Sequence, residues 1–106
     1  MATIKWNERA RLLFARHIDY ALQEYGIATA AKWFARKKQV EDSISQFPES
    51  FPRERLLLDR QRSYRRAVLM KPFKLIFVYY PSSDTVRIVD IWDMRMNPKT
   101  LKKRIG

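Results

Sequence analysis

Apolar and polar residues alternate at the start of the chain and then recur at helical spacing. Residues 2–6 alternate with Ile4 and Trp6 on one face, which is typical of a short strand. Asn7 can cap a helix, and apolar residues then return every three or four positions. This first helical stripe comprises Ala10, Leu13, Phe14, Ile18, Ala21, Leu22 and Tyr25. Gly26 is a typical helix terminator, so the pattern predicts a strand followed by a helix.

A second helix is predicted over about residues 28–46, and the two helices would form a hairpin joined at the glycine. Its apolar stripe is interrupted by Lys37 and Lys38 and comprises Ala30, Trp33, Phe34, Val40, Ile44 and Phe47. We expect the three aromatic residues of this stripe to lie in the core. His17 stands beside apolar residues of the first helix, so we expect it to be packed there or to lie at the helix edge.

The second half of the chain has the pattern of strands. After the loop PESFP, residues 53–66 form a basic connector, and strand-like runs follow at residues 63–69, 73–80 and 85–92. The run at 73–80 is apolar on both faces, which indicates a central strand. The order β-α-α-β-β-β predicts an α+β fold in which a short N-terminal strand and a helical hairpin pack on an antiparallel sheet. The helices would cover one face of the sheet, and the other face would be partly open and lined by arginines.

We expect one domain over residues 1–98, followed by a basic C-terminal tail at 99–106 that is either a short helix or disordered. The chain has no cysteine, one histidine and two glycines, which predicts no disulfide, no metal site and no phosphate-cradling loop. We therefore expect no cofactor. No signal peptide or membrane-spanning run is visible, so we expect a cytoplasmic protein without a membrane partner.

Positive charge is concentrated in the second half. The chain has a net charge of +11, with 8 basic against 6 acidic residues in 1–52 and 14 against 5 in 53–106. Such a field favours nucleic acid, a nucleoprotein or an acidic protein as partner. The candidate binding residues are Arg53, Arg55, Arg60, Arg62, Arg65, Arg66, Lys71, Lys74, Arg87, Trp92 and Arg95.

A series of motifs occurs in a characteristic order along nearly the whole chain. They are IKWNERA, the EYG turn, QFPESFPRER, SYRRAV, FKLIFVYY and VRIVDIWDMRMNP. In this order and spacing the chain resembles the RelE/ParE family of toxins from bacterial type II toxin–antitoxin pairs. The resemblance implies a small basic toxin that arrests growth and is neutralised by a cognate antitoxin, a segment of which folds as it wraps the toxin. It leaves two targets open: DNA gyrase for ParE-like members, and mRNA cut on the ribosome for RelE-like members.

The candidate catalytic residues are Arg65, Arg66, Asp93 and Arg95. The resemblance matches the YRR element to the family's Tyr-Arg element, and Arg95 to the arginine after the last strand, which in nucleases contributes to a phosphate site. Nucleolytic members tend to place a histidine or tyrosine beside or after that arginine, and WDMRMNPKTLKKRIG has neither. An aspartate of ordinary pKa, about 3.9, is a weak base for a hydroxyl, although Lys71 and Lys74 are possible substitutes. Whether the protein is an enzyme therefore stays open.

Structural interpretations compete with these functional ones. Asp93 and Arg95 are two positions apart and can pair with each other. Trp92 is either an anchor of the sheet or an exposed contact for a partner. A third function, that of a plain nucleic-acid-binding module without catalysis, is disfavoured because the aromatic residues fall mainly at core-like positions.

Overall fold

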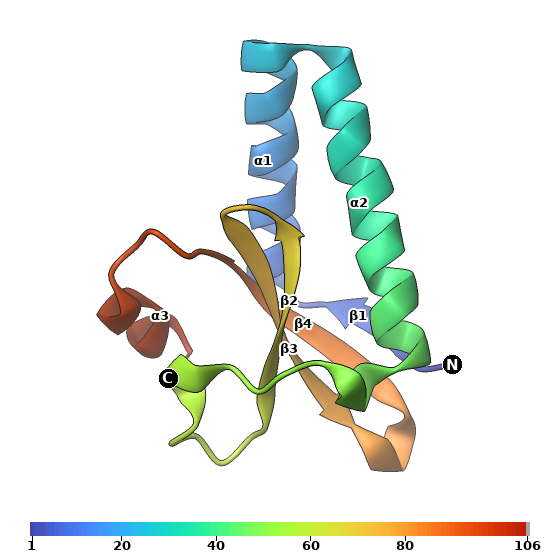
Figure 1. Cartoon of the computed structure of the whole chain (residues 1–106), viewed down its shortest axis with the longest axis vertical. Coiled ribbons are helices and arrows are strands. Elements are labelled where there is room, and N and C mark those ends of the chain that lie inside the picture. The colour runs from blue at the N-terminus through green and yellow to red at the C-terminus, as the bar shows by residue number, and fades with distance from the viewer. Residues whose placement is uncertain (106) are drawn as a thin grey trace.

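Three helices and four strands follow one another along residues 1–105 (Figure 1). The computed structural model describes residues 1–105, and Gly106, the last residue of the predicted tail, lies outside the described residues. The elements are β1 Thr3–Trp6, α1 Glu8–Tyr25, α2 Ile27–Gln46, β2 Tyr64–Met70, β3 Phe73–Tyr80, β4 Thr85–Asp93 and α3 Pro98–Arg104. Short 3-10 turns lie at η1 Pro48–Ser50, η2 Arg55–Leu57 and η3 Pro81–Ser83. The predicted α+β fold with the order β-α-α-β-β-β is confirmed.

The ends of the first helix follow from two residues of the sequence. The Asn7 side chain accepts a hydrogen bond from the Ala10 amide at 2.9 Å, as expected of a capping residue. Gly26 has φ 93°, a backbone angle that residues with a Cβ atom rarely adopt. Its amide donates to the carbonyls of Ala21 and Leu22, which ends the helix. One glycine therefore ends α1 and lets α2 begin at once, at Ile27.

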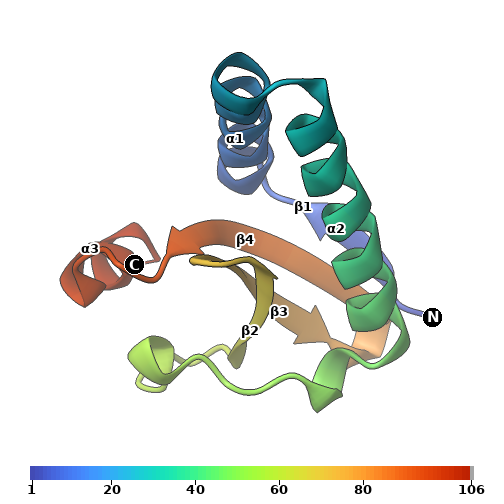
Figure 2. The same ribbon diagram turned by 45° about the horizontal axis from the view of Figure 1, so that its top comes forward.

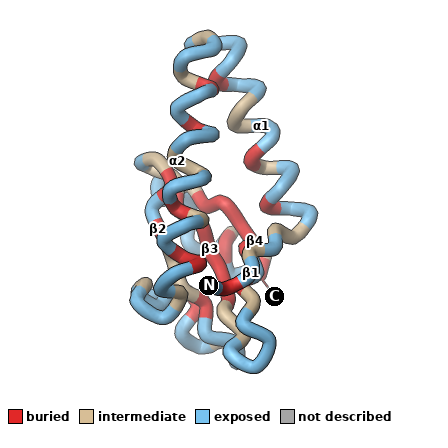
Figure 3. Tube along the Cα trace, turned by 90° about the vertical axis from the view of Figure 1, so that its right-hand side faces the viewer, coloured by how far each residue is buried: buried red, intermediate tan, exposed pale blue. Residues whose placement is uncertain are grey.

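The sheet has the strand order β1-β4-β3-β2, with β3 inside as predicted. The β2–β3 and β3–β4 pairs are antiparallel. The N-terminal strand differs from the expectation: β1 runs parallel to β4, with Ile4 opposite Val86, so the sheet is mixed. Figure 3 shows the buried residues concentrated in the strands, while the helices are largely exposed on their outer sides.

The hairpin covers one face of the sheet, where Phe14, Trp33 and Ile44 pack against residues such as Leu75 and Phe77. Trp33 is buried as predicted, but the core positions predicted for Phe34 and Phe47 are wrong, since these residues are 55% and 64% exposed. Successive residues of a helix point about 100° apart, so Trp33 faces the sheet and Phe34 turns away from it. Phe47 comes after the last residue of α2.

The hairpin also extends beyond the edge of the sheet (Figure 1). At its far end Leu22 and Tyr25 of the predicted stripe have no sheet beneath them and are 46% and 67% exposed. No helix within residues 1–105 has the length and apolar composition needed to cross a bilayer.

The opposite face carries a second, smaller core. Figure 2 shows the hairpin on one side of the sheet, with the segment that contains η2 on the other and α3 at one end. Leu57 of η2 and Leu101 of α3 are fully buried against Ile76 and Trp92. This face is more closed than the sequence pattern predicted, because apolar residues of the basic connector and of the basic tail both pack on it.

The segment after Pro98 is thus a helix docked on the sheet. Asn97 caps it by accepting from the Lys99 amide at 3.0 Å. Arg60 donates to the carbonyls of Lys102 at 2.7 Å and Ile105 at 3.1 Å, which are unpaired acceptors of the last helical turn. The connector and α3 therefore hold each other in place.

We predict that Leu101→Ala lowers the free energy of unfolding by about 2–5 kcal/mol, because it leaves a cavity in the second core. Leu58→Ala is the matched control, since Leu58 adjoins η2 but is 55% exposed, and it should change stability by less than about 0.5 kcal/mol. Urea unfolding of the two variants measures the difference. Equal losses would show that α3 does not belong to the core.

Candidate functional site

The largest group of predicted binding residues surrounds a cavity on the second face of the sheet. This cavity, which we call the basic pocket, has a volume of about 360 Å³. It is lined by Glu54, Arg55, Leu56, Arg66, Lys74, Trp92, Met94, Met96 and Pro98. Four of the predicted binding residues, Arg55, Arg66, Lys74 and Trp92, thus come together.

Two of these four residues are buried and serve the fold. Lys74 is 7% exposed and forms an ion pair with Glu54, which is 2% exposed. Glu54 in the connector compensates the charge of Lys74, so this lysine is not a free cation. Trp92 is 1% exposed and is an anchor of the sheet, which decides between the two interpretations of this residue. The free charge of the basic pocket comes from Arg55 and Arg66.

The YRR element does not act as a unit. Arg65 and Arg66 are neighbours on β2, and the side chains of neighbouring residues in a strand point to opposite faces. Arg65 donates from Nη1 to the Phe51 carbonyl at 2.6 Å, and so ties the loop before the connector to the sheet. Arg66 lines the basic pocket and donates to the Arg53 carbonyl. Only Arg66 is placed for binding there.

Asp93 and Arg95 form the pair that their spacing predicted. Arg95 donates from Nε to Asp93 Oδ1 at 3.0 Å and from Nη2 to Oδ2 at 2.9 Å. These hydrogen bonds lower the pKa of Asp93 and raise the pKa of Arg95. Asp93 is thereby a poorer base than an ordinary aspartate, and the donors of the Arg95 guanidinium are partly occupied.

The remaining candidates are spread over the surface. Arg62 and Tyr64 line a separate polar cavity of about 480 Å³ together with Arg60, which is already engaged with α3. Lys71 is exposed in the turn between β2 and β3, and Arg87 is exposed on β4. The predicted binding residues are therefore divided among several places, and they do not form one phosphate site.

His17 is packed as the sequence predicted, but its location was not foreseen. The imidazole stacks on Trp33 with a centroid distance of 5.1 Å and lies 4.4 Å from the Phe73 ring centroid. Burial lowers its pKa, and the nearby charge of Asp93 acts in the opposite direction. A histidine therefore does approach the end of β4, from the side of the helices. Sequence spacing gave no signal for this contact, because α1 and β4 are far apart along the chain.

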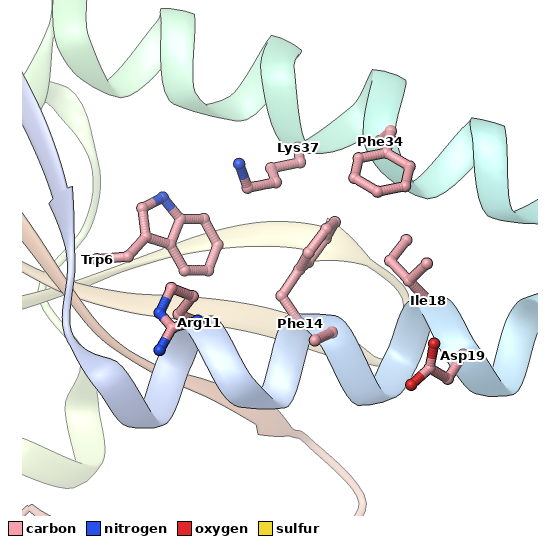
Figure 4. A pocket seen from close by; sticks show the side chains of 8 residues that line it. Trp6, Arg11, Phe14, Ile18, Asp19, Phe34 and Lys37 are labelled. Carbon is pink, nitrogen blue, oxygen red and sulfur yellow. The ribbon is translucent and has the colours of Figure 1, made fainter.

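A third cavity lies between the helices of the hairpin, and Figure 4 shows its side chains. This cavity, the aromatic groove, has a volume of about 390 Å³. It is lined by Trp6, Arg11, Phe14, Ala15, Ile18, Asp19, Phe34 and Lys37. Sequence reasoning missed it because it assigned Phe34 to the core.

Aromatic rings form much of the surface of the aromatic groove. The Phe14 ring centroid lies 5.9 Å from that of Trp6 and 5.6 Å from that of Phe34, in edge-to-face geometry. Lys37 Nζ lies 5.1 Å from the Trp6 centroid, and the Trp6 indole donates to Glu41 at 2.9 Å. Lys37 also pairs with Glu41 at 3.4 Å, and Arg11 and Asp19 complete the charged part of the lining. The aromatic surface between these charges is suited to an apolar side chain of a partner segment.

No protein-family model matches the chain, and no curated protein matches it significantly. Among residues 1–105, no three side chains of His, Asp or Glu gather in a way that could hold a metal ion.

We predict that Lys74→Met lowers the free energy of unfolding by about 3–5 kcal/mol, because it leaves the Glu54 carboxylate buried without its partner. The double variant Lys74→Met/Glu54→Gln should recover most of that loss, since neither charge remains. Lys38→Met is the control, because the Lys38–Asp42 pair has side chains 77% and 56% exposed and is worth about 0–1 kcal/mol. Chemical denaturation that gave equal losses for the two lysine variants would contradict the burial of the pair.

We predict that stability falls as the pH drops from about 7.5 to about 5, in part through His17, the only histidine. Its pKa in the folded protein is lowered from the ordinary 6.5, so the unfolded chain takes up a proton first. The contribution is complete above the unfolded pKa and is lost as the pH falls through the folded pKa. His17→Phe should make the free energy of unfolding less dependent on pH in this range. An unchanged pH profile would show that the imidazole is not held in its neutral form.

Proposed function

We propose that the protein is a toxin of RelE/ParE type that inhibits bacterial growth by binding an intracellular protein target, and that a cognate antitoxin neutralises it. The proposed target is DNA gyrase, as for ParE-like members. The ordered motifs of the sequence support this proposal, and the hairpin-on-sheet arrangement is compatible with it.

The aromatic groove is the observation that carries the proposal. Phe34 is 55% exposed and lies in one hollow with the rings of Trp6 and Phe14, and a continuous apolar surface of this kind marks an interaction site. An antitoxin segment that is disordered when free, acidic, and equipped with apolar anchors could fold into such a groove. The charge of +11 favours the encounter with an acidic partner.

Binding of a protein target is favoured over RNA cleavage by the state of the candidate catalytic residues. Cleavage by attack of a 2′-hydroxyl needs a base, an acid and cations on the phosphate. Asp93 is held by Arg95 with a lowered pKa, Lys74 is neutralised by Glu54, and Arg65 is tied to the Phe51 carbonyl. The basic pocket has two arginines for a phosphate, and its lining includes no histidine or tyrosine.

A ribosome-dependent mRNA endonuclease is the second candidate, and one observation favours it. Arg55 and Arg66 lie beside the same hollow of the sheet and could hold a phosphodiester there. Cleavage of mRNA on translating ribosomes that is lost in Arg66→Ala would establish this candidate and overturn the gyrase proposal.

We predict that expression of the protein alone arrests bacterial growth and that co-expression of the adjacent gene restores it. Phe34→Ala should remain toxic but escape rescue, because the antitoxin loses an aromatic contact in the groove. The dissociation constant of the complex between the Phe34→Ala variant and the antitoxin should rise roughly tenfold, which corresponds to about 1–2 kcal/mol of lost apolar burial. Growth curves and calorimetric titration of the complex measure the two effects.

Phe47→Ala is the matched control, since Phe47 is also exposed but lies outside the aromatic groove, and it should be rescued like the wild type. Unchanged growth while folded protein accumulates would contradict the toxin proposal. Equal rescue of both phenylalanine variants would contradict the role of the groove.

A further inference from the structure

A fourth cavity lies between α1 and the end of α3, on a part of the molecule that the proposed function does not use. It has a volume of about 440 Å³ and is lined by Arg9, Leu12, Leu13, Arg16 and Arg104. We call it the basic cleft. Three of its five lining residues are arginines, although its α1 side belongs to the less basic half of the chain.

Two of these arginines are held close together by the fold. Arg104 pairs with Asp90, and its guanidinium carbon lies 5.5 Å from the Trp92 ring centroid. Arg9 donates from Nη1 to the Arg104 carbonyl at 2.8 Å. The contacts of Arg9 with the Arg104 carbonyl and of Arg104 with Asp90 form within the protein itself, so both cations are in position before a ligand binds.

The basic cleft has an uncompensated positive charge. Asp90 is the carboxylate paired with Arg104, and it is fully buried beneath the cleft. Burial raises the pKa of Asp90, while the charges of Arg104 and Arg9 oppose that rise, so both arginines act on this one carboxylate. Arg16 is exposed at the other end of the cleft. The three arginines of the lining carry more positive charge than the one carboxylate of Asp90 balances, so the cleft attracts further anions.

Two leucines separate the charges. Arg9, Leu12, Leu13 and Arg16 follow the spacing i, i+3, i+4, i+7 and share one face of α1. Leu12 is 44% exposed, a large value for an apolar residue between two arginines. The helical rise of about 1.5 Å per residue puts Arg9 and Arg16 about 10 Å apart along the axis. In a polyproline II chain, with three residues per turn and a rise of about 3.1 Å per residue, residues three positions apart share one face and are about 9 Å apart.

We propose that the basic cleft binds an acidic peptide of a partner protein in the extended polyproline II conformation, in which two carboxylates three positions apart meet Arg9 and Arg16 and the apolar side chains between them cover Leu12 and Leu13. The bound carboxylates relieve the repulsion among the guanidinium groups, and the leucines are removed from water. A peptide fits better than nucleic acid, because a phosphodiester backbone has no apolar side chain to set on an exposed leucine. This inference does not depend on the proposed toxin activity.

The test is an NMR titration of the whole ¹⁵N-labelled protein with the synthetic peptide Gly-Glu-Leu-Leu-Glu-Gly. We expect saturable shifts at residues 9–16 and 100–105. Arg16→Gln should weaken binding roughly fivefold, as for one partly exposed ion pair. Leu12→Ser should weaken it by a similar factor. Both side chains are exposed, so the variants should melt like the wild type.

The controls separate the cleft from the overall charge. Lys32→Gln removes one exposed positive charge of α2 outside the cleft and should bind the peptide like the wild type. The peptides with Gln for Glu, or with Ser for Leu, should bind more weakly than the parent. Equal affinity of the wild type, Arg16→Gln and Leu12→Ser would overturn the proposal. So would an oligothymidine of about 12 nucleotides that occupies the same residues more tightly than the peptide at equal salt.

Discussion

The structure depends on the burial of β3 on both of its faces. Five consecutive residues of this strand, Lys74 to Val78, are buried, so the chain must supply apolar cover twice. The helical hairpin covers one face, and Leu57 and Leu101 cover the other. Both short covering segments are rich in arginine and lysine, and they remain docked because Arg60 binds the carbonyls of α3 and Arg104 binds Asp90.

This constraint changes the meaning of the high positive charge. Several arginines donate hydrogen bonds to backbone carbonyls. Arg36 donates to the carbonyls of Val68 and Leu69, and Arg65 donates to that of Phe51. Such side chains fasten loops and helix ends, where unpaired carbonyls need donors. A count of arginines therefore overstates the surface available for an acidic partner. The surfaces that remain include the aromatic groove, the basic pocket and the basic cleft, which are separate from one another.

Local patterns of the sequence predicted the elements well, and contacts between distant segments explain the failures. Asn7, Gly26 and the apolar run of β3 mark their elements directly, because capping, positive φ and a doubly buried strand are local properties. The positions of Phe34 and Lys74 could not be read in this way. Phe34 belongs to the apolar stripe of α2 yet lies on the exposed edge of that stripe. The sequence suggests that Lys74 is a cation available for binding, but in the fold it forms an ion pair with Glu54, which lies 20 positions earlier in the chain.

The second face of the sheet is closed because α3 is part of the folded core. Hydrogen exchange of the unmodified protein, followed by NMR, tests it directly at the Ile105 amide, which donates to the Leu101 carbonyl at 3.1 Å. The account predicts exchange much slower than that of an unstructured amide, together with protection of the buried β3 amides. Exchange of Ile105 at the unprotected rate, while β3 stays protected, would contradict it.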